Sequence, residues 1–105
     1  MADDLKELVP VLVDRTNQGK VQWEALTGST LVAHVGKTVI ELSRERELTT
    51  LIVRDDQGRR LEDVSENELD SMFDKLLNKL YDLARRQALR VNETLEALKS
   101  DLERL

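Results

Sequence analysis

The C-terminal third of the chain places an apolar side chain at almost every helical turn. Eleven such residues between positions 69 and 105 are separated by ten steps over 36 residues, a mean spacing of 3.6, the period of an α-helix. They are Leu69, Phe73, Leu76, Leu80, Ala84, Ala88, Val91, Leu95, Leu98, Leu102 and Leu105. A chain of 105 residues is one domain with one modest core. The sequence therefore predicts a single domain, 1–105, in which a long amphipathic helix occupies more than a third of the chain.

The start of this helix has a capping signal. Residues 65–68 read Ser-Glu-Asn-Glu, a capping box in which Ser65 and Glu68 satisfy each other's backbone donors. Val64 and Leu69 flank it in the positions of a hydrophobic staple. Two predictions stay open further along: a continuous or merely kinked helix, or a turn at residues 90–92 with Asn92 capping a second helix.

The chain begins with a second amphipathic segment. We expect a helix at about residues 4–17, with Gly19 in the place of a C-terminal glycine cap. Pro10 lacks a backbone donor, so we expect an irregularity near it. The apolar positions at helical spacing are Leu5, Leu8, Val9, Leu12 and Val13.

Between the two helices the apolar period changes toward that of strands. Gly36-Lys37 joins two strand-like runs, a typical two-residue hairpin turn. Residues 55–58, Asp-Asp-Gln-Gly, predict a second turn with glycine in the left-handed region. The three predicted strands are Thr30–Val35, Thr38–Ser43 and Leu48–Arg54. Arg59–Glu62 is a candidate fourth strand, and Lys20–Leu26 is a short strand or an extended connection.

Alternation along these strands separates two faces of the sheet. The predicted core face holds Leu31, Ala33, Val35, Ile40, Leu42, Leu51 and Val53. The other face is mixed and holds Val32, His34, Val39, Glu41, Ser43 and Ile52. The connections are too short for crossovers, so the sheet is an antiparallel meander. The predicted fold is a two-layer α+β domain: a helix, three to four strands, and a long helix.

Composition excludes several classes of function. The net charge is −5, and basic residues are interspersed with acids, which argues against a nucleic-acid interface. The chain has no cysteine, which removes disulfides and thiolate chemistry. The N-terminus has no apolar run of signal-peptide length, and no stretch approaches the ~20 apolar residues that span a bilayer. We therefore expect a cytoplasmic protein that does not enter membranes.

No pattern indicates catalysis, and we expect no catalytic residue, no cofactor and no metal site. His34 is the single histidine and has no ligand cluster around it in the sequence, so we interpret it as structural. Residues 55–58 lack the alternating oxygen ligands of an EF-hand and are better interpreted as a turn. A local basic band on the long helix is either a solvated face or a contact for an acidic partner. Its members are Lys79, Arg85, Arg86 and Arg90.

The last turns of the long helix have coiled-coil spacing. From Val91 to Leu105 the apolar steps alternate 4, 3, 4, 3, the heptad rhythm. About 40 helical residues extend ~60 Å, whereas a compact domain of this length has a radius of gyration near 13 Å. The helix therefore either folds back near residue 91, or residues 91–105 project and pair with another chain.

These observations favour a small non-enzymatic interaction module that is homodimeric and binds a protein through apolar helix and sheet surface. One alternative is an acidic regulatory or immunity-type protein that binds a basic partner. A more distant one is a carrier of a hydrophobic ligand between sheet and helix. Trp23 is either a core anchor or an interface anchor. The residues expected to carry the contact are Trp23, Tyr81, Val91, Leu95, Leu98 and Leu102.

In size, acidity and the order of helix and small sheet, the chain resembles type III secretion chaperones. Those are small acidic dimers that bind exported proteins, so the resemblance implies a chaperone-like alternative with an exported partner. The sequence departs from that family because the later strand pair and helix of its fold have no room in 105 residues. The resemblance covers no specific motif and implies no site residue.

Overall fold

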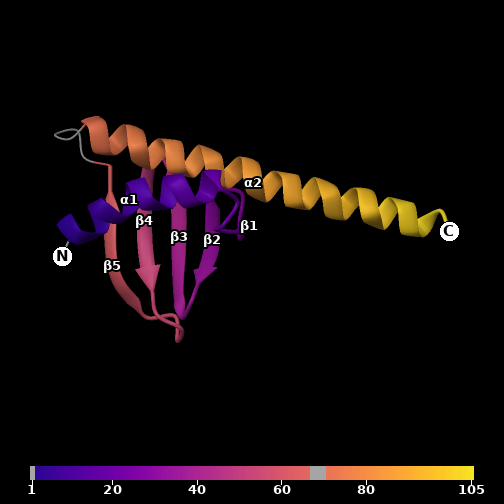
Figure 1. Ribbon diagram of the computed structural model, residues 1–105, viewed down its shortest axis with the longest axis horizontal. Helices are drawn as coiled ribbons and strands as arrows, with labels where there is room; N and C mark the ends of the chain where they lie inside the picture. Colours follow the sequence, from indigo (N-terminus) through magenta and orange to yellow (C-terminus); the bar gives the residue numbers. More distant parts are fainter. Residues whose placement is uncertain (1, 67–70) are drawn as a thin grey trace.

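The computed structural model describes residues 2–66 and 71–105, and it is a two-layer α+β domain (Figure 1). Two helices cover one face of a sheet whose strands follow one another in chain order, β1-β2-β3-β4-β5, each antiparallel to the next. The elements are α1 (Ala2–Asn17), β1 (Trp23–Ala25), β2 (Thr30–Val35), β3 (Thr38–Glu45), β4 (Leu48–Arg54), β5 (Arg60–Ser65) and α2 (Ser71–Glu103). The predicted fold class is confirmed. The two segments whose strand assignment was left open, 20–26 and 59–62, contribute to β1 and β5, so the sheet has five strands.

Helix α1 ends as its sequence indicates. Gly19 has a φ of 72°, its amide donates to the carbonyl of Thr16, and the Lys20 amide donates to the carbonyl of Arg15. These two bonds form a Schellman motif, which ends a helix and satisfies its last carbonyls. Pro10 is exposed and lies inside α1, which continues on both sides of it.

The core lies between the two helices and one face of the sheet. Helix α2 contributes its predicted stripe, of which Phe73, Leu80, Ala84 and Ala88 are buried. Leu76 in the stripe is only partly buried, whereas Leu77, which the stripe did not include, is fully buried. Of the residues predicted on the core face, Leu31, Ala33, Ile40, Leu42 and Leu51 are buried and Val53 is partly buried.

For one residue of the predicted core face, Val35, the expected burial is wrong. Val35 is 43% exposed, because β2 ends at the hairpin turn away from the two helices (Figure 1). Alternation assigned the correct face but not the extent of the cover, because the helices cross only part of the sheet.

The other sheet face has no described helix over it. His34 is exposed there, and Val32 and Val39 are half-buried. Two ion pairs lie on or beside it: Arg54 with Glu41 at 3.6 Å and Arg60 with Asp63 at 2.6 Å. This distribution is typical of a solvated antiparallel sheet face.

Helix α2 is continuous through residues 90–92, so the alternative of a turn there is wrong. The last residue of α2 in the core is Ala88, and every residue from Glu93 to Leu105 is exposed. The end of the helix extends past the edge of the sheet (Figure 1). The molecule therefore measures 55 × 29 × 27 Å, and its radius of gyration is 15.0 Å rather than the ~13 Å of a compact chain of this length.

The predicted capping box is only partly testable. Ser65 is the last residue of β5, and its hydroxyl lies 2.9 Å from that of Thr50. Asn67, Glu68 and Leu69 lie outside the described residues, so the capping box stays a prediction.

The β3–β4 hairpin turns through two residues that disfavour the required backbone. Glu45 pairs with Leu48, which leaves Arg46 and Glu47 as a two-residue turn with φ values of 51° and 66°. Turns with both central residues in the left-handed region favour Asn-Gly, since a side chain there costs about 1 kcal/mol. This turn carries backbone strain that glycine would relieve.

Glu47→Gly is expected to raise the free energy of unfolding by about 0.5–1 kcal/mol, because Glu47 is exposed and its left-handed φ suits glycine. Urea denaturation measures the change. The matched control is Gly36→Ala in the β2–β3 turn, where φ is 60° and a loss of about 1 kcal/mol is expected. A destabilised Glu47→Gly variant would show that the Glu47 side chain has a stabilising contact that outweighs the strain.

Candidate interaction surface

The most exposed apolar surface lies at the end of α2. Leu95, Leu98 and Leu102 are 57%, 52% and 59% exposed, and Leu105 is fully exposed. We call these four residues the leucine seam. Leu95, Leu98 and Leu102 lie on one side of α2, and Leu105 follows at the same heptad spacing two residues after Glu103, the last residue of the helix. Glu96, Ser100 and Glu103 occupy other sides. The seam is thus an ordered apolar stripe without a cover in the described chain.

The seam continues the buried face of α2 without a change of phase. Counting back in heptads from Leu95 and Leu98 gives Ala88 and Ala84, which are 1% and 0% exposed. The same side of the helix therefore packs on the sheet as far as Ala88 and is exposed from Leu95 onward. We call the sheet, α1 and α2 up to Ala88 the head.

A small apolar pocket lies where the seam meets the head. It has a volume of about 210 Å³, between α2 and the β1–β2 connection. Leu26 in that connection and Leu89 on α2 are both exposed. The lining residues are Ala25, Thr27, Gly28, Leu31, Tyr81, Arg85, Ala88 and Leu89. The apolar surface therefore runs from the seam onto the head.

Two of the residues expected to carry the contact are in the core instead. Trp23 is 1% exposed, and its indole N–H donates to the Thr16 hydroxyl at 3.0 Å. Tyr81 is 4% exposed, and its hydroxyl donates to the Ser29 carbonyl at 3.3 Å. Both rings are used to assemble the domain, so neither is available as an exposed anchor. The side chain of Val91 lies outside what the structure describes.

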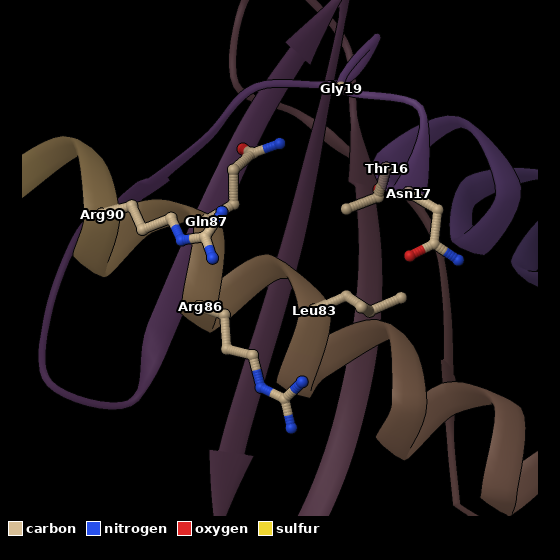
Figure 2. A pocket seen from close by; sticks show the side chains of 7 residues that line it. All are labelled: Thr16, Asn17, Gly19, Leu83, Arg86, Gln87 and Arg90. Carbon is tan, nitrogen blue, oxygen red and sulfur yellow. The ribbon is translucent and has the colours of Figure 1, made fainter.

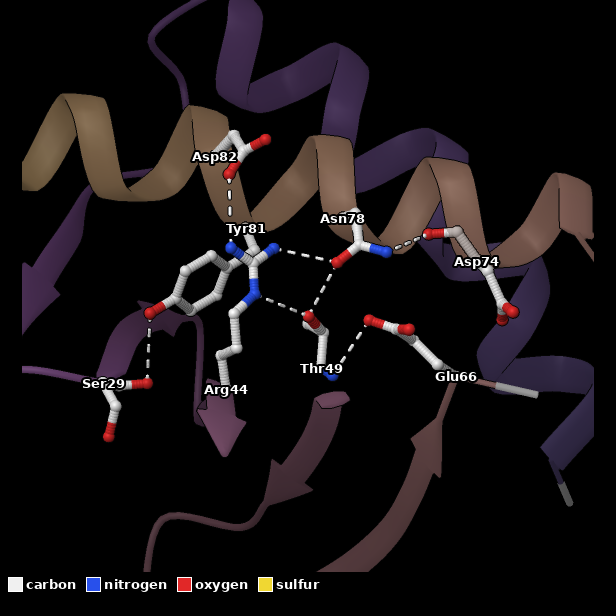
Figure 3. A network of polar contacts seen from close by, with 8 residues as sticks. All are labelled: Ser29, Arg44, Thr49, Glu66, Asp74, Asn78, Tyr81 and Asp82. Atoms are coloured by element: carbon white, nitrogen blue, oxygen red, sulfur yellow. Dashed lines mark hydrogen bonds and ion pairs between the residues drawn. The ribbon is translucent and has the colours of Figure 1, made fainter. Parts of the chain in front are cut away.

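A polar network joins the β3–β4 hairpin to α2, and it was not found from the sequence (Figure 3). Arg44 stacks over the Tyr81 ring at 4.1 Å, and its guanidinium donates to Thr49 at 3.1 Å and to Asn78 at 2.8 Å. The fully buried Thr49 hydroxyl donates to the side-chain oxygen of Asn78 at 2.8 Å. Asp82 completes an ion pair with Arg44 at 3.6 Å.

The pairing register explains why Arg44 lies inside. Arg44 pairs with Thr49, on the same side of the sheet as Leu42 and Leu51. The sequence shows Arg44 as the start of a polar boundary segment, and only the full length of β3, to Glu45, places it on the inner face. Among the described residues, no buried side-chain nitrogen or oxygen lacks a hydrogen-bond partner. A fully satisfied network of this kind positions α2 on the sheet.

Gln87 forms the second polar attachment of α2. Its side-chain amide donates to the Val21 carbonyl at 2.6 Å and accepts from the Trp23 amide. It thereby pairs with the backbone on both sides of Gln22, as a neighbouring strand would. This contact holds the short edge strand β1 against the helix.

The basic band predicted on α2 lies beside this attachment. Arg86 and Arg90 line an open groove of about 340 Å³ between α2 and the end of α1, with their side chains at its rim (Figure 2). Lys79 and Arg86 line a second groove further along α2. Gln87, which also lines the first groove, is occupied by the backbone of residues 21 and 23. The band is an exposed positive surface without a buried polar group directed into it.

The described part of the chain holds no group of three or more His, Cys, Asp or Glu side chains placed to bind a metal ion. Asp55 accepts hydrogen bonds from the Gln57 and Arg59 amides and from the Arg59 guanidinium. The backbone hydrogen bond from Arg59 contributes most to lowering the pKa of this carboxyl below its usual value. Its oxygens thus serve the turn, which Gly58 closes with a φ of 83° as predicted. No described helix is both long enough and apolar enough to cross a bilayer.

Comparison of the chain with models of protein families, with curated proteins and with solved structures found no significant match.

The structural role of the network gives a test. Asn78→Ala is expected to lower the free energy of unfolding by about 1–3 kcal/mol, because it leaves the buried Thr49 hydroxyl without its acceptor. Asp82→Ala is the control: this side chain is 56% exposed, so removing its ion pair should cost less than about 1 kcal/mol. Thermal unfolding by circular dichroism compares the two. Equal effects would show that the buried hydroxyl does not depend on Asn78.

Proposed function

We propose that this protein is a small non-enzymatic interaction module that forms a homodimer through the end of α2. The observation that carries the proposal is the leucine seam: four leucines at heptad spacing, in phase with the core and exposed. Isolated exposed leucines are ordinary, but a contiguous stripe on a regular helix is typical of an association surface. Its occupant is a second copy of the same stripe.

The helix surface supports this role better than the uncovered sheet face. On that face the valines are already half-buried, and the ion pairs of Glu41 with Arg54 and of Asp63 with Arg60 occupy its charged groups. On the seam, each leucine has more than half of its surface left to bury. Burying a leucine fully is worth about 1.5–3 kcal/mol, and the gain from eight half-exposed leucines is of the same order as the cost of association. The dimer is therefore expected to be weak and dependent on concentration.

The alternatives have less support in the geometry. The charged surface described on α2 around Lys79, Arg86 and Arg90 is positive, which does not suit a basic partner. The apolar pocket of about 210 Å³ lies below the ~300 Å³ at which ligand pockets usually begin, which does not suit a hydrophobic carrier.

The test is the double substitution Leu98→Glu/Leu102→Glu. The wild-type chain is expected to change from monomer to dimer over a concentration series in sedimentation equilibrium, and the variant to stay monomeric at every concentration. Both leucines lie outside the core, so the far-ultraviolet circular dichroism and the melting temperature of the head should be unchanged.

Leu61→Glu is the matched control. Leu61 is 61% exposed in β5, away from the seam, so this variant should dimerise as the wild type does. A wild-type chain that stays monomeric throughout would refute the homodimer. A variant that still dimerises would place the interface elsewhere.

A further inference from the structure

We infer that the second copy lies antiparallel, with the last turn of its α2 against the pocket at the base of the first copy's seam. This inference rests on the proposed homodimer and specifies its orientation and register. It follows from the phase of the seam, the position of the head and the charges beside the leucines.

The head excludes a parallel pair with straight helices. In a parallel dimer, each residue of α2 lies beside the same residue of the other copy, on the side of the seam. Up to Ala88 that side of α2 is covered by its own sheet, with Leu77 and Ala84 fully buried. The second helix would have to pass through the space that the first head fills. An antiparallel copy meets the seam from the opposite direction, and its own head lies at the far end.

One antiparallel register fits the described surface. With Leu95 opposite Leu98 of the second copy, Leu105 comes opposite Ala88, beside the pocket and Leu89. An overlap longer by one heptad would move Leu105 away from the exposed Leu89 to Tyr81, beside the charged side chain of Asp82 that pairs with Arg44. In an antiparallel pair, the residues on one flank of the seam face the same flank of the second helix. An overlap shorter by one heptad would therefore bring Lys99 beside Lys99 on one flank and Asp101 beside Asp101 on the other, and both pairs are repulsive.

The charges beside the seam are complementary in the chosen register. Asp101 lies one turn from Arg90 of the second copy, and Lys99 lies close to Glu96 of the second copy, each pair occurring twice by symmetry. In a parallel pair Lys99 would instead face Thr94. The part of α2 that leaves the head is basic, whereas residues 93–105 contain four acidic and two basic side chains and are acidic as a whole.

Single cysteines test the orientation directly, because the chain has none of its own. Leu89→Cys and Leu105→Cys change exposed residues outside the core. In the antiparallel register these two positions are neighbours between copies, whereas Leu105 of one copy is ~25 Å from Leu105 of the other at 1.5 Å per residue. A short bismaleimide should therefore join the two variants when they are mixed and join neither variant to itself. Leu61→Cys gives the background of random collision.

A charge exchange tests the register. Arg90 and Asp101 are 11 residues apart, about 16 Å along one helix, so they can meet only between copies. Arg90→Asp alone is expected to weaken the dimer about fivefold or more, since two attractive pairs become repulsive. Arg90→Asp/Asp101→Arg should return the dissociation constant to near the wild-type value.

The outcomes separate this inference from the proposed function. Cross-linking of Leu105→Cys to itself would establish a parallel dimer, which overturns the antiparallel arrangement and leaves the homodimer intact. A dimer in which the mixed pair does not exceed the Leu61→Cys background, or which the charge exchange does not rescue, refutes the register. A chain that is monomeric by sedimentation refutes both.

Discussion

The apolar face of α2 is the constraint on which the rest of the molecule depends. Leu77, Leu80 and Ala84 are fully buried where this face meets the sheet and α1. A five-stranded meander with one apolar face needs a cover to be stable, and α2 supplies it together with α1. Because α2 is longer than the sheet is wide, the apolar face that completes the core continues past the edge of the sheet (Figure 1).

Two polar attachments fix how α2 lies on the sheet. Asn78 is held by Arg44 and Thr49, and Gln87 is held by the backbone of Val21 and Trp23. They are more than two helical turns apart, so together they set the rotation of the helix as well as its position. Since the helix is rigid over this length, that rotation also decides where the leucine seam points. The polar network thus determines the direction in which the leucine seam points.

The distribution of charge along α2 differs between the part beside the head and the part that carries the seam. The chain is acidic as a whole, yet Arg85, Arg86 and Arg90 lie together where α2 leaves the head. Asp101 and Glu103 lie near the far end of the helix. When two helices that are basic at the base and more acidic at the tip run antiparallel, the base of each lies beside the tip of the other. This is the electrostatic reason to expect antiparallel pairing.

The sequence by itself determined the order and type of the elements, because helices and strands leave different apolar periods. The stripe of α2, the Gly19 cap and the Gly36 and Gly58 turns could be predicted from local residues alone, and so could the exposure of Leu95 and Leu98 in part, from the length of the helix. The tertiary structure decided features that the apolar period of the sequence cannot show. Trp23 and Tyr81 are buried because elements distant in sequence close over them. Arg44 lies on the inner face of the sheet because β3 extends two residues beyond Ser43, where its polarity suggests that it ends. Among the described side chains of α2, Ala88 is buried and Glu93 to Leu105 are exposed, and the position of that change depends on the width of the sheet, which no residue of α2 encodes.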